Sequence, residues 1–139
     1  MRLLDRLHPL ALLVLRVVLG VIMVAHGSIK VFGGMSKHIA LVQNIGLPGW
    51  MAYLSAIAEF GGGILLIAGL LTRLSALAVL IDMIVAIARV HFKNGLRGAG
   101  GYEFPLALAA IAFALIFLGA GPISLDAAFF GSAGTSKKK

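Results

Sequence analysis

The sequence predicts an all-α membrane protein, built as a four-transmembrane-helix bundle with a short interfacial helix between helices 1 and 2. Two observations lead to this fold class. First, 60% of the 139 residues are hydrophobic and 12% are charged, whereas a soluble domain has about 25% charged residues. Second, the chain contains four apolar spans, each close to the roughly 20 residues that a helix needs to cross a bilayer. Helices are expected because an open strand edge would leave backbone polar groups unpaired in lipid.

Residues that end helices or mark a membrane surface separate the predicted elements. Gly33 and Gly34 end the first span in the manner of a left-handed helix cap. The segment 35–49 is too short to cross, and its apolar spacing suits a helix lying along the interface. Trp50 then suits the headgroup level. The four spanning helices are expected at residues 9–32, 50–71, 74–92 and 103–121.

These helices are expected to form a single membrane domain over residues 1–131, followed by a flexible basic tail at residues 132–139. The orientation is predicted from Lys and Arg, which are enriched in cytoplasmic loops. The amino end, the turn at Arg73 and the tail carry more of these residues than the opposite loops. We therefore expect a multi-pass protein of the bacterial cytoplasmic (inner) membrane, with both termini cytoplasmic.

The composition also narrows the chemistry. The chain has no cysteine, which excludes disulfides, thiolate metal ligands, cysteine-held iron–sulfur clusters and thiol nucleophiles. We expect no metal site. The net charge of +7 would suit nucleic acid in a soluble protein, but basic residues at the ends of membrane helices contact anionic lipid instead. Membrane lipid is therefore the expected partner, and nucleic acid is not.

Small residues define the expected packing faces, because they let membrane helices approach closely. The fourth helix is expected to pack through a stripe of Glu103, Ala107, Ala110 and Ala114. The third places Asp82 and Arg89 on one face. The inward faces of the first two helices follow the helical repeat. They are expected to hold Arg16, Gly20, Met23, Gly27 and Lys30 in the first helix, and Ala52, Ser55, Ala56, Glu59, Gly62, Gly63 and Leu66 in the second.

Several ionisable side chains fall inside the spans, where a charge costs about 2.5–3.5 kcal/mol on a lenient insertion scale. Glu59 lies roughly 13 Å beyond Trp50, near mid-membrane. Such groups need partners, so we expect ion pairs between Arg16 and Asp82 and between Glu59 and either Lys30 or Arg89. Arg16 and Asp82 are assigned to structure. The candidates for ligand binding or proton handling are Glu59, His26, Lys30, Arg89, His91 and Glu103.

The order and spacing of several motifs resemble the DoxX family of small four-helix membrane proteins. The matching motifs are Arg16-Val-Val-Leu-Gly20, His26-Gly-Ser-Ile-Lys30, Glu59-Phe-Gly-Gly-Gly-Ile-Leu-Leu-Ile-Ala-Gly69-Leu-Leu-Thr72-Arg73, Gly100-Gly-Tyr-Glu103-Phe-Pro105-Leu and Gly119-Ala-Gly-Pro122-Ile-Ser-Leu-Asp126. The resemblance covers residues 10–126. It implies an integral membrane protein of a family named for a subunit of a thiosulfate:quinone oxidoreductase, and it implies no catalytic residue.

Three functions are compatible with these features. The first is a quinone-linked or redox-associated membrane subunit, in which the polar candidates around Glu59 bind a quinone or another small apolar ligand and handle its protons. The second is a non-catalytic assembly or stabilising subunit that docks on a membrane protein partner or a second copy. The third is a proton or small-solute transporter. Haem held axially by His26 and His91 is a fourth, less favoured interpretation.

Overall fold

The computed structural model describes residues 1–131, in which every regular element is a helix or a helical turn. The predicted tail, residues 132–139, lies outside the described residues. The five-residue turns η2 and η3 are π-helical, η1 is a kink between two helices, and η4 is a 3₁₀ turn. The elements are α1 (Arg2–Asp5), α2 (His8–Ile29), η1 (Lys30–Gly34), α3 (Met35–Asn44), α4 (Met51–Ala56), η2 (Ile57–Gly61), α5 (Gly62–Ala68), α6 (Thr72–Ala86), η3 (Ile87–His91), η4 (Phe92–Asn94), α7 (Glu103–Leu118) and α8 (Leu125–Phe130).

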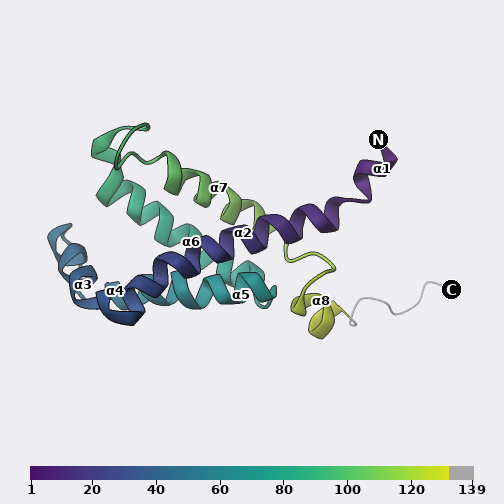
Figure 1. Ribbon diagram of the computed structural model, residues 1–139, viewed down its shortest axis with the longest axis horizontal. Coiled ribbons are helices and arrows are strands. Elements are labelled where there is room, and N and C mark those ends of the chain that lie inside the picture. The colour runs from purple at the N-terminus through teal and green to yellow at the C-terminus, as the bar shows by residue number, and fades with distance from the viewer. Residues whose placement is uncertain (132–139) are drawn as a thin grey trace.

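Three stretches of helix are long and apolar enough to cross a membrane: His8–Asn44, Met51–Ala68 and Thr72–Asn94. The first of them bends at Phe32 and Gly33, where Gly33 has a φ of 135°, so that α2 and α3 run in different directions (Figure 1). The fourth apolar helix, α7, is shorter. The all-helical prediction is confirmed for residues 1–131, with three long apolar helices.

The long helices run beside one another, so the molecule has two distinct ends (Figure 1). One end carries α1, α8 and the tight turn between α5 and α6. There, the backbone N–H of Asp126 donates to the carbonyl oxygen of Gly69 at 2.8 Å. The other end carries α3 and the glycine-rich loop between η4 and α7. The connections between the long helices lie alternately at one end and the other, so successive long helices run antiparallel (Figure 1).

Glycine contacts hold α2 against the helix formed by η2 and α5. A Cβ atom on Gly20 would lie 2.7 Å from the carbonyl oxygen of Gly63, and one on Gly63 would lie 2.8 Å from that of Gly20. Neither position has room for a side chain, because the two backbones touch there. The predicted inward faces of the first two helices are confirmed, except that Lys30 and Ser55 are only half-buried. The buried residues are Arg16, Leu19, Gly20, Met23 and Gly27 in α2, and Ala52, Ala56, Glu59, Gly62, Gly63 and Leu66 in the second helix.

The predicted packing stripe of α7 is wrong. Glu103, Ala107 and Ala110 are exposed, and the buried residues of α7 are Pro105, Leu108, Ala109, Ala112 and Leu115. These side chains join a core with Leu19, Met23, Leu66, Val79 and Met83 from the other long helices. Two leucines make more van der Waals contacts with the neighbouring helices than alanine methyl groups can, and leucine packing therefore selects this face.

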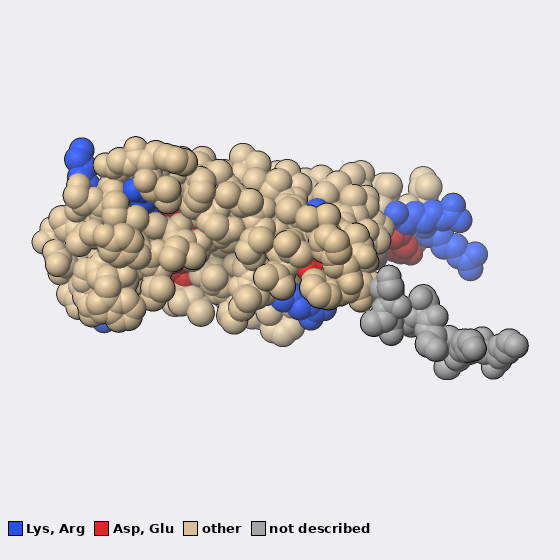
Figure 2. All heavy atoms as spheres, turned by 90° about the horizontal axis from the view of Figure 1, so that it is seen from below, with Lys and Arg blue, Asp and Glu red and all other residues tan. Residues whose placement is uncertain are grey.

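The outer surface of the long helices is apolar. Many large hydrophobic side chains are exposed on it, among them Val14, Val21, Ile64, Ile81 and Phe113. In the view of Figure 2, uncharged surface covers most of the length of the molecule, and Lys and Arg gather mainly towards its two ends. This distribution is the one expected for a protein whose middle is surrounded by lipid.

Candidate ligand-binding site

A cavity of about 990 Å³ lies between α2, α3, the second helix, α6 and the start of α7. Its walls are mostly apolar. Ligand sites have this size and this character, with a small number of polar groups that fix the orientation of the ligand. The titratable residues that line it are His26, Lys30, His38, Glu59, Asp82, His91 and Glu103. The cavity is therefore the place where most of the ionisable side chains of the predicted spans converge.

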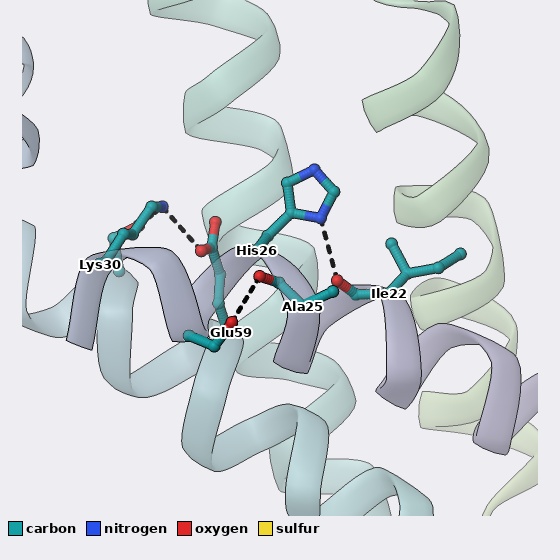
Figure 3. A network of polar contacts seen from close by, with 7 residues as sticks. Ile22, Ala25, His26, Lys30 and Glu59 are labelled. Carbon is teal, nitrogen blue, oxygen red and sulfur yellow. Dashed lines mark hydrogen bonds and ion pairs between the residues drawn. The ribbon is translucent and has the colours of Figure 1, made fainter. Parts of the chain in front are cut away.

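Lys30 and Glu59 form an ion pair at the centre of this group (Figure 3). The Nζ atom of Lys30 lies 2.7 Å from Oε2 of Glu59, and the two side chains are 20% and 7% exposed. Lys30 also donates a longer hydrogen bond, of 3.4 Å, to Oγ of Ser55. Of the two partners expected for Glu59, the structure selects Lys30.

Irregular turns carry most of the charged candidates. Lys30 begins the kinked segment η1, Glu59 is the middle residue of the π turn η2, and Arg89 and His91 lie in the π turn η3. A π turn inserts one residue into the helical repeat and redirects the side chains around it, and such turns occur frequently at functional sites. The sequence shows no pattern that predicts them.

Asp82 reaches the same cavity from α6. Its carboxyl group is placed beside the side chains of Glu59 and Ser55, within electrostatic range of Lys30. The expected pair between Arg16 and Asp82 is therefore wrong. Asp82 belongs to the ligand cavity, where one cation faces two carboxyl groups.

Arg16 lies towards the opposite end of the bundle. Its Nη1 and Nη2 atoms donate to the carbonyl oxygens of Ala120 at 2.6 Å and Ile123 at 2.8 Å. The side chain is 2% exposed, and Asp126 lies within electrostatic range. The guanidinium group fits this task because its planar donors can bond two acceptors at once. Arg16 thus fastens the segment between α7 and α8 to α2, in keeping with the structural role expected for it.

His26, His91 and Glu103 also line the cavity, and His26 and Glu103 are exposed. Nδ1 of His26 is 2.9 Å from the carbonyl oxygen of Ile22 (Figure 3). Nδ1 of His91 is 2.8 Å from that of Gly100. In each ring one nitrogen is thereby engaged by the backbone, and Nε2 is left to face another group. His91 also fastens the glycine-rich loop that forms part of the cavity wall.

Arg89 is not part of the cavity lining. It is exposed, and its Nη1 atom donates a long hydrogen bond of 3.5 Å to the carbonyl oxygen of Ile45. The alternative pairing of Glu59 with Arg89 is therefore wrong. Among the residues singled out in the sequence, the cavity brings together His26, Lys30, Glu59, Asp82, His91 and Glu103, and it leaves out Arg16 and Arg89.

Two lining residues with an unpartnered buried polar atom were not predicted as site residues. His38 lies in α3, within electrostatic range of Lys30 and Glu59, and Ser75 lies in α6. The Nε2 atom of His38 and the Oγ atom of Ser75 are buried and have no hydrogen-bond partner within residues 1–131. A buried polar atom without a partner is costly, so these two atoms point to a ligand or water in the cavity. Only the position of His38 beside Lys37 in a segment predicted to be amphipathic could have suggested it from the sequence.

Comparisons with known proteins show a family match that covers most of the cavity lining, up to residue 92. The sequence profile of the DoxX family matches residues 11–92. A Bacillus subtilis (strain 168) protein named "Putative oxidoreductase CatD" is 36% identical over 111 residues, which are 80% of this chain and 82% of that protein. A protein of Haemophilus influenzae (strain ATCC 51907 / DSM 11121 / KW20 / Rd), named "Uncharacterized protein", is 32% identical over 136 residues, covering 91% and 96% of the two chains. No solved structure matches the chain.

Proposed function

Because this chain belongs to the DoxX family, we propose that it is a redox-associated membrane subunit that binds a quinone at the Lys30–Glu59 pair. The observation that carries the proposal is the composition of the cavity. Apolar walls enclose an ion pair, and the buried Nε2 of His38 and Oγ of Ser75 have no partner within residues 1–131. The name of the Bacillus subtilis relative, "Putative oxidoreductase CatD", agrees with a redox role.

The donors in the cavity suit the polar ends of a quinone ring. An ammonium group has three donors, and Lys30 directs its contacts to Glu59 and Ser55, which leaves one donor for a carbonyl oxygen of the ligand. A neutral imidazole offers one donor and one acceptor, so His38 can serve as a second contact. The apolar wall residues pack against the faces of the ring.

The two carboxyl groups suit the protons of the same reaction. Reduction of a quinone to a quinol consumes two electrons and two protons, and the electrons would come from a redox partner in the membrane. Glu59 and Asp82 lie in the same cavity and share one cation, so a carboxyl group is available beside the ligand oxygens. It could pass one proton to a ligand oxygen, and the second proton would reach the ligand from water by way of the same carboxyl group.

We place the cavity within a four-span protein of the bacterial cytoplasmic membrane. In this arrangement α2, α4 to α5, α6 to η3, and α7 cross the bilayer, and α3 lies along the interface. The exposed apolar surface of these helices supports it, as does the position of Trp50 at the start of α4, where an indole suits the headgroup region. Both termini then lie on the cytoplasmic side.

Binding of a short quinone tests the proposal. The purified protein in lipid nanodiscs is titrated with a tail-less dimethoxy-methyl-benzoquinone, alongside Lys30→Met and Lys37→Met variants. Lys37 is exposed and lies outside the cavity lining, so its substitution is a matched control. We expect saturable binding to wild type and to Lys37→Met, and affinity at least tenfold weaker in Lys30→Met, because a charged hydrogen bond contributes about 1.5–3 kcal/mol.

Two outcomes contradict the proposal. Wild-type protein that shows no saturable binding above that of empty nanodiscs has no quinone site. Equal affinity in all three proteins would show that the quinone binds away from Lys30. Either result would favour the assembly role, in which the ion pair only fixes the register of the helices.

A further inference from the structure

An apolar slot runs along the outside of the cavity, between the second helix and α6. Four residues of each helix line it, and both sets recur at intervals of four, three and four residues, so each set occupies one helix face. The slot residues are Leu54, Ala58, Gly61 and Leu65 on the second helix, and Leu74, Ala78, Ile81 and Val85 on α6. All eight are apolar.

The slot is open along its outer side. Leu54 is 53% exposed, Leu74 is 64% exposed and Ile81 is 54% exposed, although all three line the cavity. The second helix and α6 pack together at Gly62, which lies close to Val79 and Ser75. Beyond this contact, towards α4, the two helices diverge (Figure 1), so the slot communicates sideways with the lipid that surrounds the bundle.

The slot and the polar site belong to one continuous cavity. Ala58 directly precedes Glu59 in the chain, and Ile81 directly precedes Asp82. The apolar side chains therefore line the outer part of the same space whose inner part holds the two carboxyl groups. A ligand with its polar head beside Lys30 would have an apolar path leading away from it.

We propose that this slot binds the hydrocarbon tail of the ligand and admits the ligand laterally from the bilayer. The inference rests on the proposed quinone site and narrows its substrate class to lipid-soluble quinones with a long unbranched or isoprenoid tail. Eleven residues of helix separate Leu54 from Leu65, which gives a slot of roughly 16 Å. A chain of this length packs its methylene groups against both helices, and these dispersion contacts replace the contacts that the tail makes with bilayer lipid.

Three small residues, Ala58, Gly61 and Ala78, give the slot its width. A Cβ atom on Gly61 would meet nothing closer than the side chain of Ile57 at 3.9 Å, so the space beside it is free. Ala78 lies midway along the α6 side of the slot. A phenylalanine at position 78 would therefore obstruct the path of a tail.

The test compares two probes in nanodiscs: the tail-less benzoquinone and the same ring with a ten-carbon chain. Apparent affinities are corrected for partition into empty nanodiscs. We expect the tailed probe to bind wild type at least tenfold more tightly than the tail-less one. In Ala78→Phe the two probes should bind with equal affinity. Ala110→Phe is the matched control, because Ala110 is an exposed alanine of α7 outside the cavity lining, and it should keep the wild-type ratio.

If Ala78→Phe still binds the tailed probe more tightly than the tail-less probe, the tail does not bind in the slot. The quinone site is wrong if the tail-less probe fails to bind wild type and a ten-carbon alcohol binds as well as the tailed quinone. In that case, loss of alcohol binding in Ala78→Phe would still support the slot as a site for hydrocarbon tails. A quinone with a diazirine at the end of its tail gives a second measurement on the wild-type protein. Adducts concentrated on the slot residues support the proposal, and adducts spread evenly over all outward faces would mean contact with bulk lipid only.

Discussion

The ammonium group of Lys30 lies 2.7 Å from the carboxylate of Glu59, and this contact joins two helices at the point where each departs from regular α-helical geometry. Lys30 begins η1 and Glu59 occupies η2. Close approach of the helices at Gly20 and Gly63 brings the two side chains together. The pair therefore depends on the glycine contacts, and it forms the polar centre of a cavity whose walls are mostly apolar.

Replacing one member of this ion pair should destabilise the protein more than replacing both members. Glu59→Gln leaves the Lys30 cation without its carboxylate, and loss of one partner of a buried ion pair costs about 3–5 kcal/mol. In the double variant Lys30→Met/Glu59→Gln no charge is left unpaired, so the melting temperature in detergent should recover towards the wild-type value. If the melting temperature of the double variant falls by the sum of the decreases seen in Lys30→Met and in Glu59→Gln, the two side chains are not coupled.

His38→Leu should weaken binding of the tail-less benzoquinone while leaving the helices in place. The buried Nε2 atom of His38 has no partner within residues 1–131, and a hydrogen bond to the ligand would contribute about 1 kcal/mol, or roughly fivefold in affinity. His8→Leu is the control, because His8 is exposed and lies outside the cavity lining. Equal affinities in the two variants would remove His38 from the site.

The sequence predicted part of this site for a physical reason. Charged groups in apolar helices need partners, and the helical repeat placed Lys30 and Glu59 on inward faces. The repeat could not predict which cation Glu59 would meet, since that choice depends on helix crossing and on π turns. His38 was not predicted because α3 was expected only to lie along the interface. The sequence marks a helix end at Gly33, but it does not determine the angle of the bend that brings α3 over the cavity.

Arg16→Lys should destabilise the end of the bundle that carries α8. A lysine has one ammonium group and cannot reproduce the two donors that Arg16 directs at the carbonyl oxygens of Ala120 and Ile123. We expect a loss of about 2 kcal/mol in the free energy of unfolding, measured in a detergent that permits reversible unfolding. Quinone binding should persist in the folded protein, because Arg16 lies outside the cavity lining.

Arg6→Lys serves as the control for this substitution, because Arg6 is exposed. A stability of Arg16→Lys equal to that of Arg6→Lys would contradict the fastening role of Arg16. The sequence suggested a carboxylate partner for Arg16, and the actual acceptors are backbone carbonyl groups of a loop. Such acceptors have no side-chain signature, so the residue pattern could not have revealed them.

Substitution by alanine should have opposite effects on stability at Gly61 and at Gly63. In Gly63→Ala the new Cβ atom would lie 2.8 Å from the carbonyl oxygen of Gly20, so α2 and α5 must separate. In Gly61→Ala the nearest atom is a side-chain carbon at 3.9 Å, and alanine favours the helix by about 1 kcal/mol. Thermal unfolding should show a lower melting temperature for Gly63→Ala and an unchanged or higher one for Gly61→Ala. A reversed order would contradict the close contact of α2 and α5.

The glycine contacts also show which parts of the fold the sequence could predict. Glycines and alanines that recur on one face of an apolar helix indicate close packing of that face against another helix. This pattern was enough to predict the inward faces of the first two helices. In α7 every face is apolar, so alanine spacing carried no directional information, and the predicted stripe was wrong. Packing of Leu108 and Leu115 against the other helices decided that face.

Lipid extraction and mass spectrometry of the wild-type protein, purified from its membrane in mild detergent, test the central claim most directly. The bound lipids are quantified against a Lys30→Met sample prepared in parallel. The proposed site predicts a long-tailed quinone at close to one molecule per chain in wild type and a several-fold lower amount in Lys30→Met. Phospholipid alone in the wild-type sample, or the same quinone content in both samples, would contradict it.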